Sequence, residues 1–412
     1  MEYDLVVVGG GPAGMLGAAV AARKGLKVVL LEKNDRLGKK LALTGGGRCN
    51  FTNDSDGEAF GRNIVTNGKF LYSALNAFAG RHLMQLFQTL GIQARVEADG
   101  RVFPASGQSG AVLKALQKHL QDSGVEVRYN SGVRQLLSRD GQAAGALLSD
   151  NTRVKGRSVL VATGGASYQQ TGSSGDGYRM ARRLGHTIVG PRPALVPLVV
   201  RDGWVRELQG LALDRVMLRV ATGGRVKAEQ SGELLFTHFG LSGPAVLNLS
   251  SFLTKHFSFP LDLIIDLKPG WPGEGLKKLL QDQLQQHPAR SLKNTLSVIL
   301  PQRLAPVILV LAGVDGSRQG AQVTRGEREE LVSVLKNLAV TVTGTRSLNE
   351  AIVTGGGVSV KEINPSTLES KIIRGLYFAG EVIDVDALTG GFNLQIAFST
   401  GYLSGSSAGD GQ

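Results

Sequence analysis

The feature that most constrains the fold is an apolar strand followed by a glycine-rich turn, at residues 5–14. Residues 5–8 are Leu-Val-Val-Val, and such a run is typical of a buried parallel strand. The turn has the spacing Gly9-x-Gly11-x-x-Gly14, and residues 13–22 are small, apolar and compatible with a helix. The pattern predicts a strand that turns tightly into a helix N-terminus, where free N–H groups and the helix dipole bind a pyrophosphate.

A second apolar strand supports this interpretation. Residues 27–31 lead into Glu32, about 20 residues after the turn, where a carboxylate suits the hydroxyls of a ribose. Because glycine makes up 56 of the 412 residues, a glycine-rich turn without a ligand is the alternative. The residues expected to hold the pyrophosphate are Gly9, Gly11, Pro12, Ala13 and Gly14.

Length and composition indicate a globular protein of two or three domains. No apolar run reaches the roughly 18–20 residues of a membrane span, so no membrane partner is expected. The first strand begins almost at the N-terminus, so no signal peptide is expected. The single cysteine, Cys49, excludes an internal disulfide and fits a reducing compartment, so a cytoplasmic location is expected.

The net charge of +12 favours a polyanionic partner such as RNA. Many of the basic residues lie near the expected nucleotide site, between residues 23 and 48. A basic enzyme whose charges hold its own cofactor is therefore an equal alternative when charge alone is considered.

The pattern of the chain predicts an α/β fold with a Rossmann-like domain that is split by an insertion. Pro191, Pro193 and Pro197 mark a break in composition, after which short alternating strands between about 195 and 267 suggest a small β-barrel or sandwich. The periodicity becomes helical between 276 and 338. The expected domains are 1–190 with 355–412 for the nucleotide, 191–268 with 339–354 for the barrel, and 269–338 for a helical insert.

Three features favour FAD over NAD as the dinucleotide. The glycine turn lies at the extreme N-terminus, residues 162–165 resemble the Ala-Thr-Gly segment of disulfide-reductase-like flavoproteins, and Gly380-Glu381 resembles their Gly-Asp segment. No second complete glycine motif with its own acidic residue is found, so NADPH or NADH is expected as a diffusible electron donor.

Four longer motifs resemble those of one family, the BaiN/RdsA family of bacterial FAD-binding flavoproteins. They lie at residues 44–53, 236–245, 353–358 and 380–395. The resemblance covers nearly the whole chain and implies a split FAD domain, an inserted barrel and a helical insert. Residues 351–355 depart from it, because many relatives carry an alanine between the threonine and the glycines.

Activities attached to the family include bile-acid reduction, aminoacetone oxidation and rRNA dihydrouridine synthesis. The resemblance and the basic charge together favour FAD-dependent reduction of a uridine in 23S rRNA, on free rRNA or a ribosomal precursor particle. One alternative is a small-molecule flavin reductase or oxidase. Another is an RNA-binding or assembly factor whose FAD is only structural.

The FAD interpretation assigns further residues. Val133 would contact the adenine through its backbone, and Glu381 the pyrophosphate–ribityl side of the cofactor. Asn393 and Leu394 begin the last helix, whose positive end could stabilise reduced flavin. An ordinary helix N-cap is the alternative for Asn393. The other expected FAD contacts are Lys33, Lys40, Arg48, Asn50, Thr163, Gly164, Gly380 and Gly391.

Two residues are candidates for the general acid. Reduction of a uracil ring needs a hydride at C6 and a proton at C5, and a thiol that is protonated at neutral pH, such as Cys49, could supply the proton. His238 is the second candidate, because imidazole titrates near neutrality. The alternatives are that Cys49 only packs beneath the flavin and that His238 is a hydrogen-bonded histidine of the barrel. Arg48 could orient flavin or bind a substrate phosphate.

Overall fold

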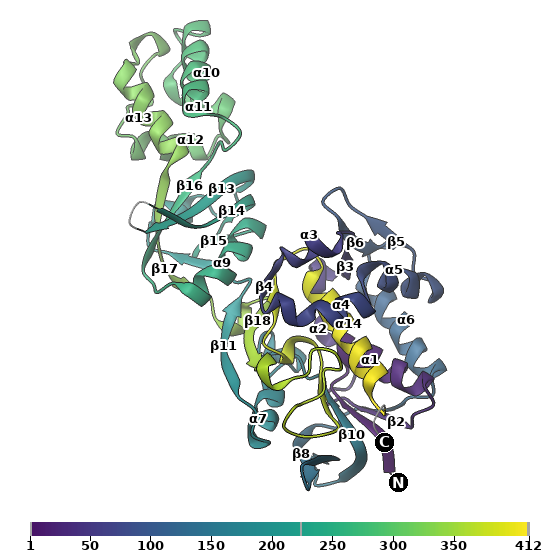
Figure 1. Ribbon diagram of the computed structural model, residues 1–412. Helices are drawn as coiled ribbons and strands as arrows, with labels where there is room; N and C mark the ends of the chain where they lie inside the picture. The colour runs from purple at the N-terminus through teal and green to yellow at the C-terminus, as the bar shows by residue number, and fades with distance from the viewer. Residues whose placement is uncertain (1, 223–224, 410–412) are drawn as a thin grey trace. The chain divides into compact units, whose positions relative to one another are not determined.

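The computed structural model describes residues 2–222 and 225–409 (Figure 1). The chain forms two compact units, of which unit 1 is Met1–Ala194 with Leu348–Gln412 and unit 2 is Leu195–Ser347. Unit 1 is therefore built from both ends of the chain, and unit 2 from its middle. The further division of unit 2 into a barrel domain and a helical domain stays a prediction.

Unit 1 is organised around a seven-stranded sheet in which β7, β2, β1 and β10 are neighbours. These four strands are parallel, as is β19 beside β10, while β9 and β8 extend the sheet antiparallel. The strands are β1 Glu2–Val8, β2 Val28–Leu31, β7 Glu126–Arg128, β8 Val133–Arg139, β9 Gln142–Leu148, β10 Arg153–Val161 and β19 Leu376–Phe378. The parallel part matches the Rossmann-type domain predicted from residues 5–32.

Alternation along β1 separates two cores, one on each face of the sheet. Leu5 and Val7 belong to the core that includes the helices α1 and α6, whereas Val6 and Val8 belong to the opposite core. Such period-two burial is what a strand covered on both faces requires. The helices of unit 1 are α1 Pro12–Arg23, α2 Lys39–Leu43, α3 Gly57–Gly61, α4 Tyr72–Ala77, α5 Gly80–Thr89, α6 Ser109–Asp122, α7 Asp176–Arg183 and α14 Phe392–Ser407.

The two ends of the chain meet where α14 packs along α1 (Figure 1). A Cβ at Gly401 would lie 2.3 Å from the carbonyl oxygen of Ala13, and one at Gly405 would lie 2.3 Å from that of Gly17. Glycine is therefore required at both positions, because the two helix backbones approach too closely for a side chain. This packing fixes the segment from residue 376 onward beside the glycine turn.

Short strands complete unit 1 at its edges. They form three small antiparallel sheets, β3–β6–β5, β4–β20 and β11–β18. Their bounds are β3 Thr52–Asn53, β4 Ile64–Thr66, β5 Ala94–Val96, β6 Arg101–Pro104, β11 Ile188–Ala194, β18 Val353–Val358 and β20 Asp386–Ala387.

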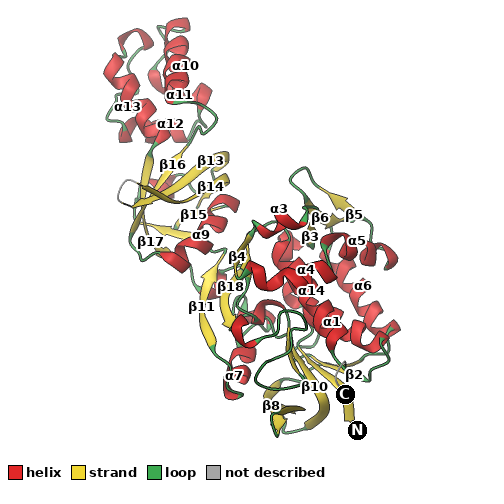
Figure 2. Cartoon of the chain, viewed as in Figure 1, coloured by secondary structure: helices red, strands yellow, loops and turns green. Residues whose placement is uncertain are grey.

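Unit 2 contains a closed antiparallel barrel with the strand order β12-β15-β14-β13-β16-β17 (Figure 2). The sequence left a barrel and a sandwich open, and the closed strand order shows a barrel. One hydrophobic core runs from the barrel into the helices that follow it. The elements are β12 Leu198–Val200, α8 Trp204–Glu207, β13 Ala212–Thr222, β14 Arg225–Phe236, β15 Gly240–Ser242, α9 Pro244–His256, β16 Leu261–Asp266, α10 Gly273–Gln286, α11 Leu292–Ile299, α12 Leu304–Leu311, α13 Arg325–Lys336 and β17 Leu338–Thr345.

Among the described residues, no single helix is both long and apolar enough to cross a membrane. The helices α11 and α12 reach that threshold only when they are taken together, and they meet at a bend of 118°.

Candidate functional site

In the glycine turn between β1 and α1, close packing requires glycine at two positions, whereas the third position has free space beside it. A Cβ at Gly14 would lie 1.9 Å from the carbonyl oxygen of Gly9. Gly9 itself has φ +104°, and a Cβ at this position would clash with the backbone of Ala162. A Cβ at Gly11 would meet no atom within 4 Å. The middle glycine therefore faces open space, which is where a diphosphate would approach the backbone.

The N-terminus of α1 is suited to an anion. Gly11 is its N-cap residue without a side-chain cap, Pro12 follows, and the first turn contains no acidic residue. The free N–H groups and the positive end of the helix dipole therefore have no compensating carboxylate within that turn.

Glu32 is buried at the end of β2, with only 6% of its surface exposed. Its Oε2 accepts the N–H of Gly10 at 2.8 Å, and its Oε1 accepts both the N–H of Asn34 at 2.8 Å and the Nδ2 group at 2.7 Å. These bonds orient the carboxylate beside the glycine turn. A carboxylate has about four acceptor positions, so capacity remains for a ribose hydroxyl. The N–H of Ser131 donates to the Glu32 carbonyl at 2.8 Å, which brings the half-buried Val133 to the same end of the sheet.

A second polar centre lies where Lys40 of α2 meets Glu381. The Lys40 Nζ donates to Glu381 Oε2 at 2.8 Å and to Ser167 Oγ at 2.6 Å. Glu381 Oε1 accepts the backbone N–H of Thr354 at 2.7 Å. The network joins four separate segments of the chain. Gly380, which has φ +75°, lies next to this network and packs closely against α1. A Cβ on Gly380 would lie 3.1 Å from the Cβ of Ala13.

Thr163 and Gly164 follow β10 at the carboxyl end of the sheet. The Thr163 hydroxyl is buried without a hydrogen-bond partner among the described residues, and Gly164 has φ +71°. The neighbouring Lys33 donates to Ser174 Oγ at 2.7 Å and pairs with Asp176 at 2.5 Å. Burial alone would raise the pKa of Asp176, but the hydrogen bonds from Lys33 and Ser174 outweigh it and lower the pKa.

The N-terminus of α14 lies beside Asn50. A Cβ on Gly391, which has φ +96°, would lie 2.8 Å from Asn50 Oδ1, a buried oxygen without a hydrogen-bond partner in the described chain. Asn393 is not the N-cap, so that alternative is wrong, because Gly391 holds this position. The Asn393 amide instead donates to the Ala387 carbonyl at 2.7 Å and accepts the N–H of Ala387 at 3.0 Å. Leu394 is half-buried and packs against the hydrophobic core that includes α1 and α6.

Arg48 lies on the surface above the aromatic ring of Phe103. Its guanidinium carbon is 4.1 Å from the ring centroid, and Nη1 pairs with Glu97 Oε1 at 3.0 Å. The side chain keeps 41% of its surface exposed, so Arg48 is held in place without being enclosed.

Cys49 is fully buried in the hydrophobic core of unit 1. Burial raises the pKa of its thiol to about 12, although a hydrogen bond with Thr44 acts in the opposite direction. The backbone has φ +61°, held by a 2.9 Å hydrogen bond from the Cys49 N–H to the Thr44 carbonyl. The chain therefore presents no thiol surface to a substrate, which favours the packing role over proton donation.

His238 lies on the exposed turn between β14 and β15 in unit 2. Its ring meets that of Phe239 edge to face at 4.9 Å, and Arg346 lies over Phe239 at 4.8 Å. His238 is thus not a buried histidine of the barrel interior. Its role as an acid stays a prediction.

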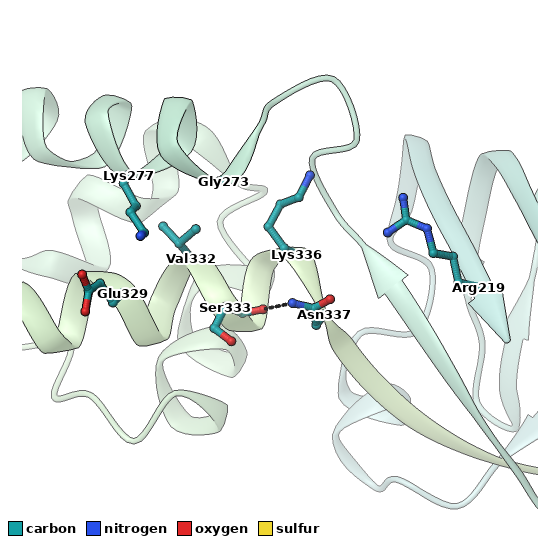
Figure 3. Close-up of a pocket in the computed structure, with 8 residues that line it drawn as sticks. All are labelled: Arg219, Gly273, Lys277, Glu329, Val332, Ser333, Lys336 and Asn337. Atoms are coloured by element: carbon teal, nitrogen blue, oxygen red, sulfur yellow. Dashed lines mark hydrogen bonds between the residues drawn. The ribbon is translucent and has the colours of Figure 1, made fainter. Parts of the chain in front are cut away.

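A shallow groove of about 630 Å³ lies in unit 2 between β13 and the helices α10 and α13 (Figure 3). Its lining includes Arg219, Lys277, Lys336 and Glu329. None of the predicted site residues lines this groove.

The structure brings most predicted cofactor residues to one end of the sheet in unit 1, while the two predicted acids lie in different units. Sequence reasoning missed the partners that orient these residues. The missed residues are Asn34, Glu97, Ser167, Asp176 and Thr354. Only Asn34 carried a local signal, because it lies two residues after Glu32 and both its N–H and its Nδ2 group donate to that carboxylate.

Comparisons with known proteins show relatives along the whole chain. A "Ribosomal RNA dihydrouridine synthase" of Escherichia coli (strain K12) is 34% identical over 406 residues, covering 97% of this chain and 96% of the relative. The same name belongs to a Haemophilus influenzae protein that is 30% identical, with 96% of each chain covered. A "3-dehydro-bile acid delta(4,6)-reductase" of Clostridium scindens is 31% identical, with 98% of each covered.

Solved structures share the fold at low identity. The 3-ketosteroid delta1-dehydrogenase of Sterolibacterium denitrificans aligns with TM-score 0.54 at 14% identity, covering 100% of both chains. The 3-ketosteroid-delta4-(5alpha)-dehydrogenase of Rhodococcus jostii RHA1 aligns with TM-score 0.51 at 19% identity, covering 99% of this chain and 96% of that one. A family model described as "HI0933-like protein Rossmann domain" matches residues 3–407. The chain therefore belongs to the HI0933-like family, the BaiN/RdsA family that its motifs resemble.

Proposed function

We propose that this protein is an FAD-dependent oxidoreductase that reduces the C5–C6 double bond of a uridine in 23S rRNA, with NADPH or NADH as electron donor. The observation that carries the proposal is the full-length similarity, at 34% identity, to a protein named for rRNA dihydrouridine synthesis. The net charge of +12 supports an RNA substrate over a small neutral one, because RNA binding depends on neutralising phosphates.

The residues of unit 1 fit FAD. The open position beside Gly11 and the uncapped α1 N-terminus suit its diphosphate, and the buried Glu32 carboxylate suits its adenosine ribose. Two buried oxygens that lack protein partners in the described chain, Thr163 Oγ1 and Asn50 Oδ1, supply further polar contacts for a bound group. When bound, FAD supplies the two-electron redox chemistry that reduction of a carbon–carbon double bond needs.

The chain's own residues hold in place the segments that surround the cofactor site. Lys40 and Glu381 hold α2 and the segment after β19 in one network, and Asn393 fixes the approach to α14 through Ala387. The α14 N-terminus offers a positive dipole end without an acidic residue in its first turn. This end suits the negative charge of a reduced flavin.

The reaction adds a hydride to C6 and a proton to C5, so a proton donor is required beside the substrate. Cys49 is disfavoured for this step because its thiol is buried. His238, which is exposed on its turn in unit 2, stays the other candidate acid that the sequence names.

A second candidate function is reduction of a steroid-like enone or dienone. It is favoured by the 31% identity, over 98% of both chains, to the bile-acid reductase of Clostridium scindens. Both reactions reduce a polarised carbon–carbon double bond, so the FAD site alone does not distinguish them.

Deleting the gene and mapping dihydrouridine across total rRNA separates the two candidates. The proposal expects one dihydrouridine to disappear and to return when an intact copy of the gene is restored. Unchanged dihydrouridine in the deletion strain would contradict the proposal and favour the small-molecule reaction.

A further inference from the structure

Three arginines surround one carboxylate at the hairpin formed by β5 and β6. Glu97 Oε1 pairs with Arg48 Nη1 at 3.0 Å and lies 3.6 Å from Arg95 Nη2, while Glu97 Oε2 pairs with Arg101 Nη2 at 2.9 Å. Asp99 Oδ2 binds Arg101 Nε at 2.7 Å. We call Arg48, Arg95 and Arg101 the arginine cluster.

The cluster is held in place but remains open to solvent. The guanidinium carbons of Arg48 and Arg101 lie 4.1 Å and 5.7 Å from the centroid of the buried Phe103 ring. The side chains of Arg48, Arg95 and Arg101 nevertheless keep 41%, 53% and 39% of their surface exposed. Stacking and pairing therefore reduce the flexibility of these side chains without enclosing them, although the Nε of Arg101 is buried.

The charges of the cluster do not balance. Three guanidinium groups face the two carboxylates of Glu97 and Asp99, which leaves a positive excess at this point. Each guanidinium has five N–H donors, and within the described chain these carboxylates engage only a few of them. Such preorganised, unused donors match the oxygens of a phosphate, which arginine binds in a bidentate manner.

The loop next to Arg48 is free of side chains. Gly46 and Gly47 have φ of +66° and +87°, are exposed, and would place a Cβ in open space. A ligand strand can therefore approach the backbone that leads into Arg48 without meeting a side chain.

We infer that the arginine cluster binds a backbone phosphate of the RNA substrate. The inference rests on the proposed function and adds to it a positioning site on the strand that carries the uridine. A phosphate contact of this kind fixes the register of a strand without reading its sequence.

The groove of unit 2 offers fewer donors for the same role. There, Lys336 pairs with Asp266 Oδ2 at 2.7 Å and donates to the carbonyls of Trp271 at 2.8 Å and Lys268 at 3.0 Å. Lys277 pairs with Glu274 at 2.8 Å. The arginine cluster is therefore the better-supplied anion site of the two.

The test measures binding of 23S rRNA from the deletion strain to the FAD-loaded protein over a range of KCl concentrations. The variants are Arg95→Gln, Arg101→Gln and the double variant. We expect Kd to rise about tenfold in the double variant, and the slope of log Kd against log salt to fall by about one for each lost phosphate contact. Arg95→Lys should retain part of the affinity, because it keeps the charge but loses the planar fork.

Arg62→Gln is the matched control. Arg62 is also exposed in unit 1, but it pairs with a single carboxylate, Glu58, at 2.6 Å. The FAD content and the melting temperature of each variant show whether the fold is intact. If Arg101→Gln alters the fold, Arg95→Gln, whose partner lies at 3.6 Å, decides the question.

The outcomes separate this inference from the proposed function. Wild-type protein that binds rRNA no better than the Arg95→Gln and Arg101→Gln variants, while still forming dihydrouridine, would overturn the inference alone. Wild-type protein that neither binds nor reduces rRNA would overturn both. If the arginine variants raise the KM for NADPH but not for NADH and leave RNA binding unchanged, the cluster binds the 2′-phosphate of NADPH. This result would overturn the RNA assignment.

Discussion

At the scale of single residues, burial distinguishes a packing cysteine from a reacting one. Cys49 has no exposed surface, and its pKa of about 12 keeps the thiol protonated and unreactive at neutral pH. We expect Cys49→Ala to form dihydrouridine within about twofold of the wild-type rate while unfolding at a lower temperature, because the substitution leaves a small cavity.

The native thiol should also react with a disulfide reagent such as Ellman's reagent at least about a hundredfold more slowly than the unfolded chain. A Cys49→Ala protein that keeps its FAD and its melting temperature but loses activity would contradict the packing role. The sequence left both roles open because burial depends on which segments cover residue 49, and these come from distant parts of the chain.

His186 makes the stability of unit 1 depend on pH. The ring is buried, with Nε2 2.8 Å from Ser370 Oγ and Nδ1 3.2 Å from the Ala181 carbonyl. Burial lowers the pKa of His186, although the hydrogen bond to Ala181 opposes the shift. Below about pH 6.5 the unfolded chain therefore binds more protons than the folded chain, and stability falls as the pH drops.

Urea unfolding between pH 7.5 and 5.5 measures this effect. Histidine can contribute up to about 1.4 kcal/mol per pH unit to the slope, and His186→Gln should remove its share. His256→Gln, at an exposed position, is the control and should keep the slope. An unchanged slope in His186→Gln would show that the burial of this ring does not control the pH dependence.

At the scale of elements, the strand–turn–helix at residues 2–23 contains one glycine that is expected to matter for stability and another that is expected to matter for FAD binding. Packing requires Gly14, since a Cβ would lie 1.9 Å from the Gly9 oxygen, whereas Gly11 faces open space. We expect Gly14→Ala to lower the free energy of unfolding by about 1–3 kcal/mol or more. Gly11→Ala should leave FAD-free stability within about 0.5 kcal/mol but weaken FAD binding about tenfold.

Fluorescence titration with FAD and urea unfolding without FAD measure the two quantities separately. Equal FAD affinity in Gly11→Ala and wild type would contradict the placement of the diphosphate at this turn.

This element is also where the sequence was most informative, because apolar runs and glycine spacing are local signals. The Lys40–Glu381 network was not predictable in its geometry, since it joins residues separated by 341 positions.

At the scale of the whole molecule, unit 2 has the properties of an inserted, self-contained structure. Its ends are adjacent, because β12 and β17 pair antiparallel with Leu198 opposite Thr345. One hydrophobic core, formed entirely by residues between 198 and 342, joins its barrel and helices. The order of apolar strands and helices predicted a β-barrel with a helical insert between the two parts of the Rossmann-like domain, whereas closure of the barrel depends on strand pairings that the sequence does not specify.

We therefore expect the fragment 195–347, expressed alone, to unfold in one cooperative transition and to bind no FAD. Circular dichroism during thermal unfolding and flavin fluorescence measure these two properties. A fragment without a cooperative transition would show that unit 2 depends on unit 1 for its stability.

At this scale we propose that the two ends of the chain form a flavin site that serves an RNA substrate. The most direct test incubates purified protein, FAD and NADPH or NADH with rRNA from the deletion strain, and locates uridines whose mass increases by about two hydrogen atoms. We predict dihydrouridine at one position, with a matching oxidation of the electron donor. Donor oxidation that requires a steroid dienone and leaves every uridine of the rRNA unchanged would contradict it.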